Sequence, residues 1–213
     1  MQAPAPRAST AGPQPTDPAA GAALVRLAVD AIRSRLTGRP FDGRIPAAPS
    51  LRRLGCSFVT LTANGALRGC IGSLEPVRPL YRDVLGNTLR AMRDPRLPPV
   101  GPDAWPGLGV HISVLSPSEP MPACEFEDLV RLLRPQVDGV IIAADGRRAT
   151  FLPSVWRSLP DPADFLAALL AKGGWRGRRL PPGAHVRRYT VVEFHGECPR
   201  EPLPAPSTVA ASS

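Results

Sequence analysis

The dipeptide Asn64-Gly65 joins two runs of β-prone residues in the stretch CSFVTLTANGALRGCIGSL, residues 56–74. Asn-Gly suits a two-residue type I′ turn, because both central residues of that turn need a positive φ. The sequence therefore predicts a tight antiparallel β-hairpin, and this hairpin constrains the fold more than any other local feature of the chain.

A two-residue turn also predicts the register of the hairpin. It places Cys70 opposite Val59 and Cys56 opposite Ser73. The two cysteines are then three residues apart along the ladder, which is about 10 Å at the rise of a strand. Because the Cα atoms of a disulfide lie within about 7 Å of each other, we do not expect a bridge between Cys56 and Cys70.

The rest of the chain mixes helical periodicity with further short strands. Apolar spacing and Gly or Pro breakers predict helices over 22–36, 79–93, 126–133 and 161–172, and strands over 108–115, 139–144, 148–152 and 187–194. Hairpins that alternate with helices are typical of an α+β fold with a largely antiparallel sheet flanked by helices. Residues 1–20 and 198–213 contain few large apolar groups and are predicted to be disordered tails around a folded part at 21–197.

The formal net charge is +8, and Lys172 is the only lysine among the 26 basic residues. This arginine bias extends over the whole chain, so nucleic-acid binding is not expected from charge alone. A local cluster of arginines around Trp175 could stack on a base, but a solvated loop is the simpler interpretation.

No apolar run approaches the roughly 20 residues of a membrane helix, and the N-terminus lacks a secretory apolar region. The expected location is cytoplasmic, with no membrane contact.

The segment LRGCIG at 67–72 is the main candidate for chemistry. Side chains alternate along a strand, so Arg68 and Cys70 are predicted to share a face, where a guanidinium would favour the thiolate. Gly69 and Gly72 leave room for a ligand or for another backbone to approach. The alternative is that Cys70 packs as a small apolar residue and the glycines mark a β-bulge.

His111 is the second candidate. In VHISVL it is predicted to lie on the strand face opposite to Val110 and Ile112, which belong to the core. A Cys–His pair is an arrangement for nucleophilic catalysis, but a lone half-exposed surface histidine is the simpler interpretation of His111. No metal-ligand spacing and no phosphate-binding loop is present, so neither a metal nor a cofactor is predicted.

Five blocks occur in a characteristic order, and the chain resembles the AMMECR domain family from about residue 20 to 197. The blocks are SFVTL, LRGCIGSLEP, DPRLPP, ISVLSP and TFLPSVW. In prokaryotes this family is the A component of the Amme-Memo-RadiSam set. The resemblance implies a two-lobed α+β fold with an antiparallel sheet and a cleft between the lobes, and it makes LRGCIG the family signature.

The resemblance also extends the set of candidate residues. Arg68, Gly69, Cys70 and Gly72 match the signature, and Asn87, Asp94 and Arg96 match polar residues of the following helix and of the DPR block. Gly69, Gly72, Asn87, Asp94 and Arg96 are therefore expected to bind a ligand. His111 departs from the family, in which this position is usually acidic.

Two functions follow as expectations. The first is an enzyme in which Cys70 is a nucleophile or redox thiol, Arg68 activates it, and Asn87 and His111 line the cleft. The second is a non-catalytic binding or scaffold module in which Cys70 only packs. The resemblance implies Memo-type and radical SAM proteins as partners, leaves the small-molecule ligand open, and puts nucleic-acid binding a distant third.

Overall fold

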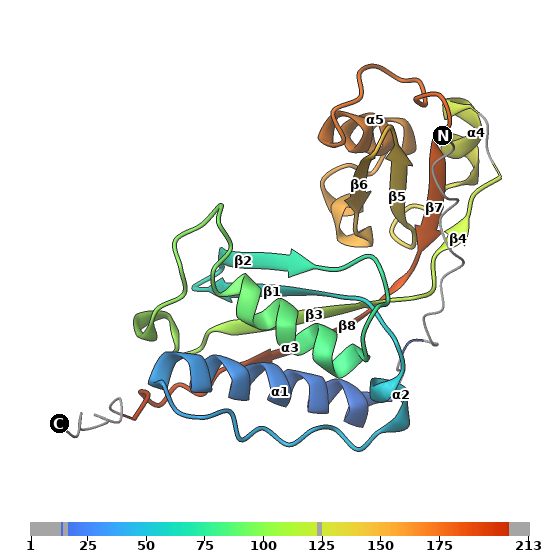
Figure 1. The fold of residues 1–213 in the computed structure, drawn as a ribbon. Helices are drawn as coiled ribbons and strands as arrows, with labels where there is room; N and C mark the ends of the chain where they lie inside the picture. The colour runs from blue at the N-terminus through green and yellow to red at the C-terminus, as the bar shows by residue number, and fades with distance from the viewer. Residues whose placement is uncertain (1–13, 15–16, 123–124, 205–213) are drawn as a thin grey trace. The chain divides into compact units, whose positions relative to one another are not determined.

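The computed structural model describes Gln14, residues 17–122 and residues 125–204, and these residues form two compact units (Figure 1). The first unit contains the described residues up to Val114 together with those from Val192 onward. The second unit is Leu115–Val191. The chain therefore leaves the first unit once and returns to it once.

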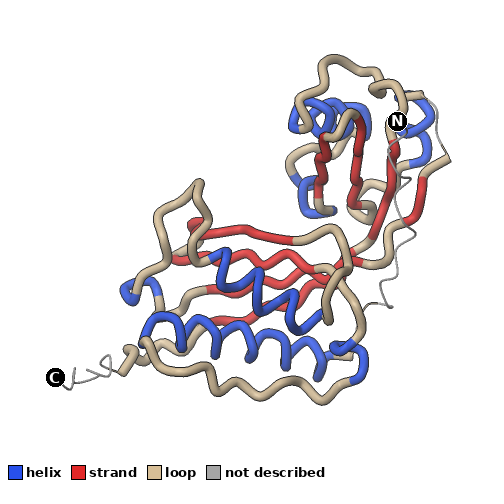
Figure 2. The backbone as a smooth tube through the Cα atoms, viewed as in Figure 1, coloured by secondary structure: helices blue, strands red, loops and turns tan. Residues whose placement is uncertain are grey.

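The first unit is a four-stranded sheet with helices on one face (Figure 2). Its elements are α1 (Pro18–Thr37), α2 (Pro49–Arg52), β1 (Ser57–Ala63), β2 (Ala66–Gly72), α3 (Leu80–Ala91), the 3-10 helix η1 (Pro102–Ala104), β3 (Gly109–Leu115) and β8 (Val191–Glu197). The strand order is β2-β1-β3-β8, and β1 pairs antiparallel with both β2 and β3.

Helix α1 begins earlier than the sequence pattern predicts. The Asp17 side chain accepts a hydrogen bond from the backbone N–H of Ala19, and Pro18 occupies the first helical position, where its missing N–H has no cost. Gly38 ends the helix in the left-handed conformation, with φ of 69°. Residues 18–20 of the predicted N-terminal tail therefore belong to the helix.

The predicted C-terminal tail also begins too early. Cys198 is buried, and its backbone N–H donates to the carbonyl of Leu108 at 2.8 Å. The indole Nε1 of Trp105 donates to the carbonyl of Glu201 at 3.0 Å. These contacts fasten the chain beyond β8 to the first unit. Residues 1–13, 15–16 and 205–213 of the predicted tails lie outside the described residues.

The two faces of the first sheet differ in character. Along β1, Val59 and Leu61 are fully buried under the helices, whereas Thr60 and Thr62 point to the opposite side and are half-buried. We call this second side the polar face; it carries Thr60, Thr62, Cys70, His111 and His195. Helices α1 and α3 both pack against the other face (Figure 1).

The second unit has its own sheet and core. Its elements are β4 (Glu119–Pro120), α4 (Phe126–Leu132), β5 (Gly139–Ala144), β6 (Arg147–Phe151), the 3-10 helix η2 (Pro153–Arg157), α5 (Pro162–Lys172) and β7 (His185–Tyr189). The sheet order is β4-β7-β5-β6. Trp156 stacks on Phe165 with ring centroids 3.8 Å apart, and its Nε1 donates to the carbonyl of Asp138.

The predicted α+β class with antiparallel pairing is confirmed, but one predicted strand is two. The run 187–194 divides at Thr190 into β7 and β8, which belong to different sheets. Thr190 N–H donates to Ser116 Oγ, and Ser116 N–H donates to the carbonyl of Thr190. An extended run looks continuous in sequence even where the chain changes sheets.

No helix in the described part of the chain is long and apolar enough to span a membrane.

Candidate functional site

The predicted hairpin is present, but its register differs from the prediction. Asn64 and Gly65 have φ of 51° and 77°, as a type I′ turn requires. The ladder then shifts by one residue between Leu61 and Thr62, so that Thr60, and not Val59, lies opposite Cys70. The extra residue of this β-bulge is Arg68. The prediction was wrong by one position because a two-residue turn alone does not show a bulge farther along the strand.

A row of polar side chains crosses three strands at this level. Thr60 on β1 pairs with Cys70 on β2 and with His111 on β3. The Thr60 hydroxyl donates to Cys70 Sγ at 3.3 Å. Two strand spacings put the backbones of Cys70 and His111 about 10 Å apart. The predicted Cys70–His111 pair is therefore not a direct contact, because Thr60 stands between the two residues.

The backbone of Cys70 is held from the outer edge of the sheet. Its N–H donates to Asp94 Oδ2 at 3.0 Å, and its carbonyl accepts from Arg96 Nη2 at 2.8 Å. Arg96 also forms an ion pair with Asp94 at 2.6 Å. These two residues take the place of a neighbouring strand along the edge strand β2.

The burial of Asp94 makes this contact electrostatically strong. The Arg96 guanidinium holds the pKa of the Asp94 carboxyl well below its usual range; burial opposes this effect, and the Cys70 N–H assists it. Asp94 is only 2% exposed. Its predicted ligand-binding role stays a prediction, and the contact that the structure shows is one that positions the Cys70 backbone. Arg96 shares that role through the Cys70 carbonyl, although most of its side chain stays exposed.

The guanidinium next to Cys70 belongs to Arg96, and not to Arg68 as predicted. Arg68 is the bulge residue, so simple alternation along the strand does not set its direction. Its Nε is buried and has no hydrogen-bond partner among the described residues. No hydrogen bond or ion pair between Arg68 and Cys70 is present in the described part of the chain. The activation of Cys70 by Arg68 is therefore not supported by a direct contact.

The space at the two signature glycines is filled by the protein itself. A Cβ on Gly69 would lie 2.0 Å from the carbonyl oxygen of Ala91, so the backbone of α3 occupies that space. A Cβ on Gly72 would lie 2.3 Å from the ring of Phe58. Both glycines allow close internal packing, and at Gly69 the approaching group is another backbone. Ligand binding at these two glycines stays a prediction.

Asn87 belongs to a closed, buried network. Its Nδ2 donates to the carbonyl of Ser57 and to Asp83 Oδ2, both at 2.9 Å. Asp83 also accepts from Ser57 N–H, Ser57 Oγ and Ser73 Oγ, and it forms an ion pair with Arg78 at 3.3 Å. Asn87 and Asp83 are both fully buried. These contacts fasten α3 to the hairpin, and the contact between Asn87 and a ligand stays a prediction.

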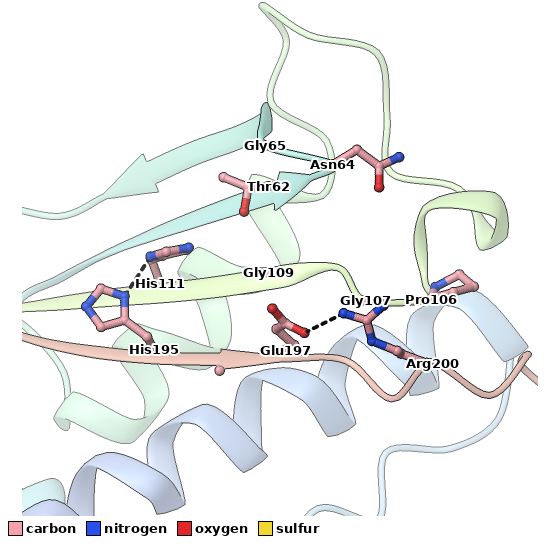
Figure 3. Close-up of a pocket in the computed structure, with 11 residues that line it drawn as sticks. Thr62, Asn64, Gly65, Pro106, Gly107, Gly109, His111, His195, Glu197 and Arg200 are labelled. Atoms are coloured by element: carbon pink, nitrogen blue, oxygen red, sulfur yellow. Dashed lines mark hydrogen bonds and ion pairs between the residues drawn. The ribbon is translucent and has the colours of Figure 1, made fainter.

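A pocket of about 430 Å³ lies at the turn end of the polar face (Figure 3). Its lining includes Thr62, His111, His195 and Arg200, together with glycines such as Gly109. None of residues 67–72 lines it, so a cleft that contains the LRGCIG signature stays a prediction. His195 was missed from the sequence because it carries no spacing signal and because the predicted strand ended at residue 194.

The two histidines of this pocket contact each other directly. His111 Nδ1 and His195 Nδ1 are 2.6 Å apart, and the ring planes are nearly perpendicular. Burial and the neighbouring His195 lower the pKa of His111, and Glu193 partly opposes this shift. His111 is therefore a neutral imidazole at neutral pH, with one donor and one acceptor nitrogen.

The other described cysteines differ from Cys70. Cys56 and Cys198 are buried free thiols, and burial raises the pKa of each to about 12. Cys70 is a free thiol as well, so the prediction that Cys56 and Cys70 form no disulfide is confirmed. Among the described residues, no group of three or more His, Cys, Asp or Glu side chains could hold a metal ion.

We compared the chain with models of known protein families. The family model AMMECR1 matches residues 25–194, which is most of the sequence. The chain belongs to the AMMECR1 family. The resemblance inferred from the LRGCIG series is thereby confirmed.

Related AMMECR1-family proteins match nearly their whole length. A protein of Methanothermobacter thermautotrophicus is 36% identical over 189 residues, which cover 82% of this chain and 93% of the relative. A protein of Thermococcus gammatolerans is 34% identical over 200 residues, which cover 86% and 93%. The crystal structure of uncharacterized protein PH0010 from Pyrococcus horikoshii matches with a TM-score of 0.75 at 32% identity, covering 84% of this chain and 92% of that one.

Proposed function

We propose that this AMMECR1-family protein is a thiol-dependent enzyme and that Cys70 is its reacting residue. The observation that carries the proposal is the fixed position of this thiol. Asp94 and Arg96 hold the backbone of Cys70 on one side, and the Thr60 hydroxyl donates to its sulfur on the other. A nucleophile held this way keeps its orientation without rearrangement during a reaction.

The contrast with the other described cysteines supports the same assignment. Cys56 and Cys198 are 4% and 2% exposed, whereas Cys70 is half-buried. With a pKa of about 12, only about one in 10⁴ of the Cys56 or Cys198 side chains is a thiolate at pH 8. The thiolate is the nucleophilic form, so Cys56 and Cys198, which are buried and almost entirely protonated, are chemically inert.

Alkylation tests this assignment. The folded protein is treated with iodoacetamide at pH 8 for increasing times, and the modified peptides are quantified by mass spectrometry. We expect Cys70 to be modified well before Cys56 and Cys198, which serve as internal controls. Modification of Cys70 no faster than Cys56, which lies on the same hairpin, would rule out a reactive thiol at this position.

We also propose that the protein acts together with a Memo-type protein and a radical SAM protein. Membership of the AMMECR1 family supports this proposal. The three purified proteins are mixed, complex formation is followed by size-exclusion chromatography, and conversion of S-adenosylmethionine is followed by mass spectrometry. We expect a complex with the wild-type protein. Cys70→Ser should keep the complex but lose the dependence of the conversion on this protein, and Cys198→Ala should keep both.

The same experiment separates the enzyme from a binding or scaffold module. Full conversion with Cys70→Ser would show that the thiol only packs, and a module that brings its partners together would then be the better description. Absence of any complex would refute the partners while leaving the alkylation result untouched. We do not propose nucleic-acid binding, because Trp175, the aromatic residue of the arginine cluster, is only 7% exposed and cannot stack on a base.

A further inference from the structure

The contact between His111 and His195 requires a defined arrangement of protons. Two imidazole nitrogens 2.6 Å apart must share one proton, since one of them has to donate and the other has to accept. Glu193 decides which arrangement is favoured. Its Oε2 lies 3.9 Å from Nε2 of His195, so a proton on that nitrogen is stabilised by the carboxylate.

This places the remaining protons of the neutral pair. With a proton on His195 Nε2, the Nδ1 of His195 is an acceptor. His111 then donates through its own Nδ1, and its Nε2 carries a free lone pair. The opposite arrangement would turn a bare His195 Nε2 toward the Glu193 carboxylate, which is unfavourable.

The free nitrogen of His111 faces the pocket. A Cβ added to Gly109 would lie 3.5 Å from His111 Nε2 and 2.4 Å from Thr62 Oγ1. Gly109 thus leaves room for the Thr62 hydroxyl close to His111 Nε2, and both residues line the 430 Å³ pocket (Figure 3). A small molecule in this pocket can reach the imidazole lone pair and the Thr62 hydroxyl at the same time.

The charges around the pocket nearly balance. Glu197 and Arg200 form an ion pair at 3.7 Å at its rim, and Glu193 lies next to His195. Among the described residues that line the pocket, Arg200 is the only arginine or lysine, and it is already paired, which disfavours a strongly anionic ligand. A neutral polar molecule with a hydroxyl group fits this environment better.

We propose that Glu193, His195 and His111 form a proton relay that makes His111 Nε2 a general base toward the hydroxyl group of a small polar molecule bound in this pocket. The pocket volume is in the range of small-molecule sites. In this scheme Thr62 orients the hydroxyl group, and Gly109 leaves room for the Thr62 side chain beside His111. The relay lies apart from Cys70 and does not rest on the proposed thiol chemistry.

The proton transfer balances within the described residues. The O–H bond of the bound molecule breaks, its proton forms a bond with His111 Nε2, and the electron pair stays on the oxygen. The Nδ1 proton of His111 moves to Nδ1 of His195 over the 2.6 Å contact. The positive charge then rests on His195, where Glu193 stabilises it. His111 returns to a neutral imidazole with the proton on the other nitrogen.

Side-chain ¹⁵N–¹H spectroscopy of the histidines tests the relay directly. At pH 8 we expect His111 to carry its proton on Nδ1 and His195 on Nε2. As the pH falls, the uptake of one proton should shift the signals of both rings in a single shared transition. His185 lies on β7 in the second unit and serves as the control, because it is not part of the histidine pair.

Two variants sharpen the test. His195→Gln removes the ring to which His111 donates, so the spectrum of His111 should change while that of His185 does not. Glu193→Gln removes the stabilising charge, so the shared transition should move to lower pH. A proton on His111 Nε2 at pH 8, or separate transitions for the two rings, would overturn the relay.

Diethyl pyrocarbonate reports the reactivity of the free nitrogen. This reagent acylates unprotonated imidazole, and His111 is less exposed than His185. We nevertheless expect His111 to react faster in the wild-type protein and to lose this advantage in Glu193→Gln, with His185 unchanged. A His111 rate below that of His185, and insensitive to Glu193→Gln, would contradict a general base at this site.

Discussion

Asp83→Asn is expected to lower the free energy of unfolding of the first unit by about 3 kcal/mol, the cost of leaving buried donors without their charged acceptor. The Asp83 carboxylate is fully buried and accepts from Ser57, Ser73 and Asn87 in addition to pairing with Arg78. The NH₂ group of an asparagine would face the N–H and O–H groups that now donate to the carboxylate, so donors would face donors. It would also leave the Arg78 guanidinium without its counter-charge.

Amide hydrogen exchange followed by mass spectrometry measures this effect within the first unit. Peptides from β1, β2 and α3 should exchange faster in Asp83→Asn, whereas peptides from α5 should keep their protection. Asp30→Asn is a matched control, because Asp30 is a half-buried residue of α1 whose ion pair with the exposed Arg33 is long, at 4.0 Å. It should change stability by less than about 1 kcal/mol. Equal effects of the two substitutions on stability would contradict a large contribution of the buried Asp83 network.

Gly69→Ala is expected to cost the first unit about 3 kcal/mol, at the upper end of the usual range for overpacking. The added methyl group would lie 2.0 Å from the carbonyl oxygen of Ala91 in α3. That oxygen belongs to the backbone and cannot move aside as a side chain would. Either β2 or α3 must shift, and the contacts of Cys70 with Asp94 and Arg96 would shift with it.

Gly86→Ala is the control for this substitution. Gly86 lies within α3, and a Cβ there would meet only the end of the flexible Arg78 side chain at 3.3 Å. Alanine favours a helix over glycine by about 1 kcal/mol, so Gly86→Ala should be neutral or stabilising. Urea denaturation compares the two variants. A Gly69→Ala protein as stable as Gly86→Ala would contradict the close packing of β2 against α3.

Local patterns in the sequence predicted the elements of the fold well. Asn64-Gly65 forms the turn it predicts, and the apolar spacing within α3 and α5 matches the buried faces of these helices. Such features depend on interactions between residues close in sequence. The AMMECR1 family membership likewise followed from short motifs in a fixed order.

The environment of Cys70 could be predicted only in part. The sequence indicated Cys70, Asp94 and Arg96 as candidates, but it could not show that Asp94 and Arg96 hold the backbone of Cys70. The β-bulge at Arg68 changed the partner of Cys70 from Val59 to Thr60. The glycines of this segment indicated that a β-bulge was possible, but they did not show that one forms or that Arg68 is its extra residue.

The sequence by itself determined the hairpin, the main helices, the antiparallel α+β class and the family, because each depends on short-range periodicity or on turn chemistry. Only the tertiary structure decided that β8 returns to the first sheet and brings His195 to His111, 84 positions apart in the chain. It also decided that Asn87 and Asp83 are buried together. Contacts between distant segments depend on how strands are ordered in a sheet, and no local pattern in this chain encodes that order.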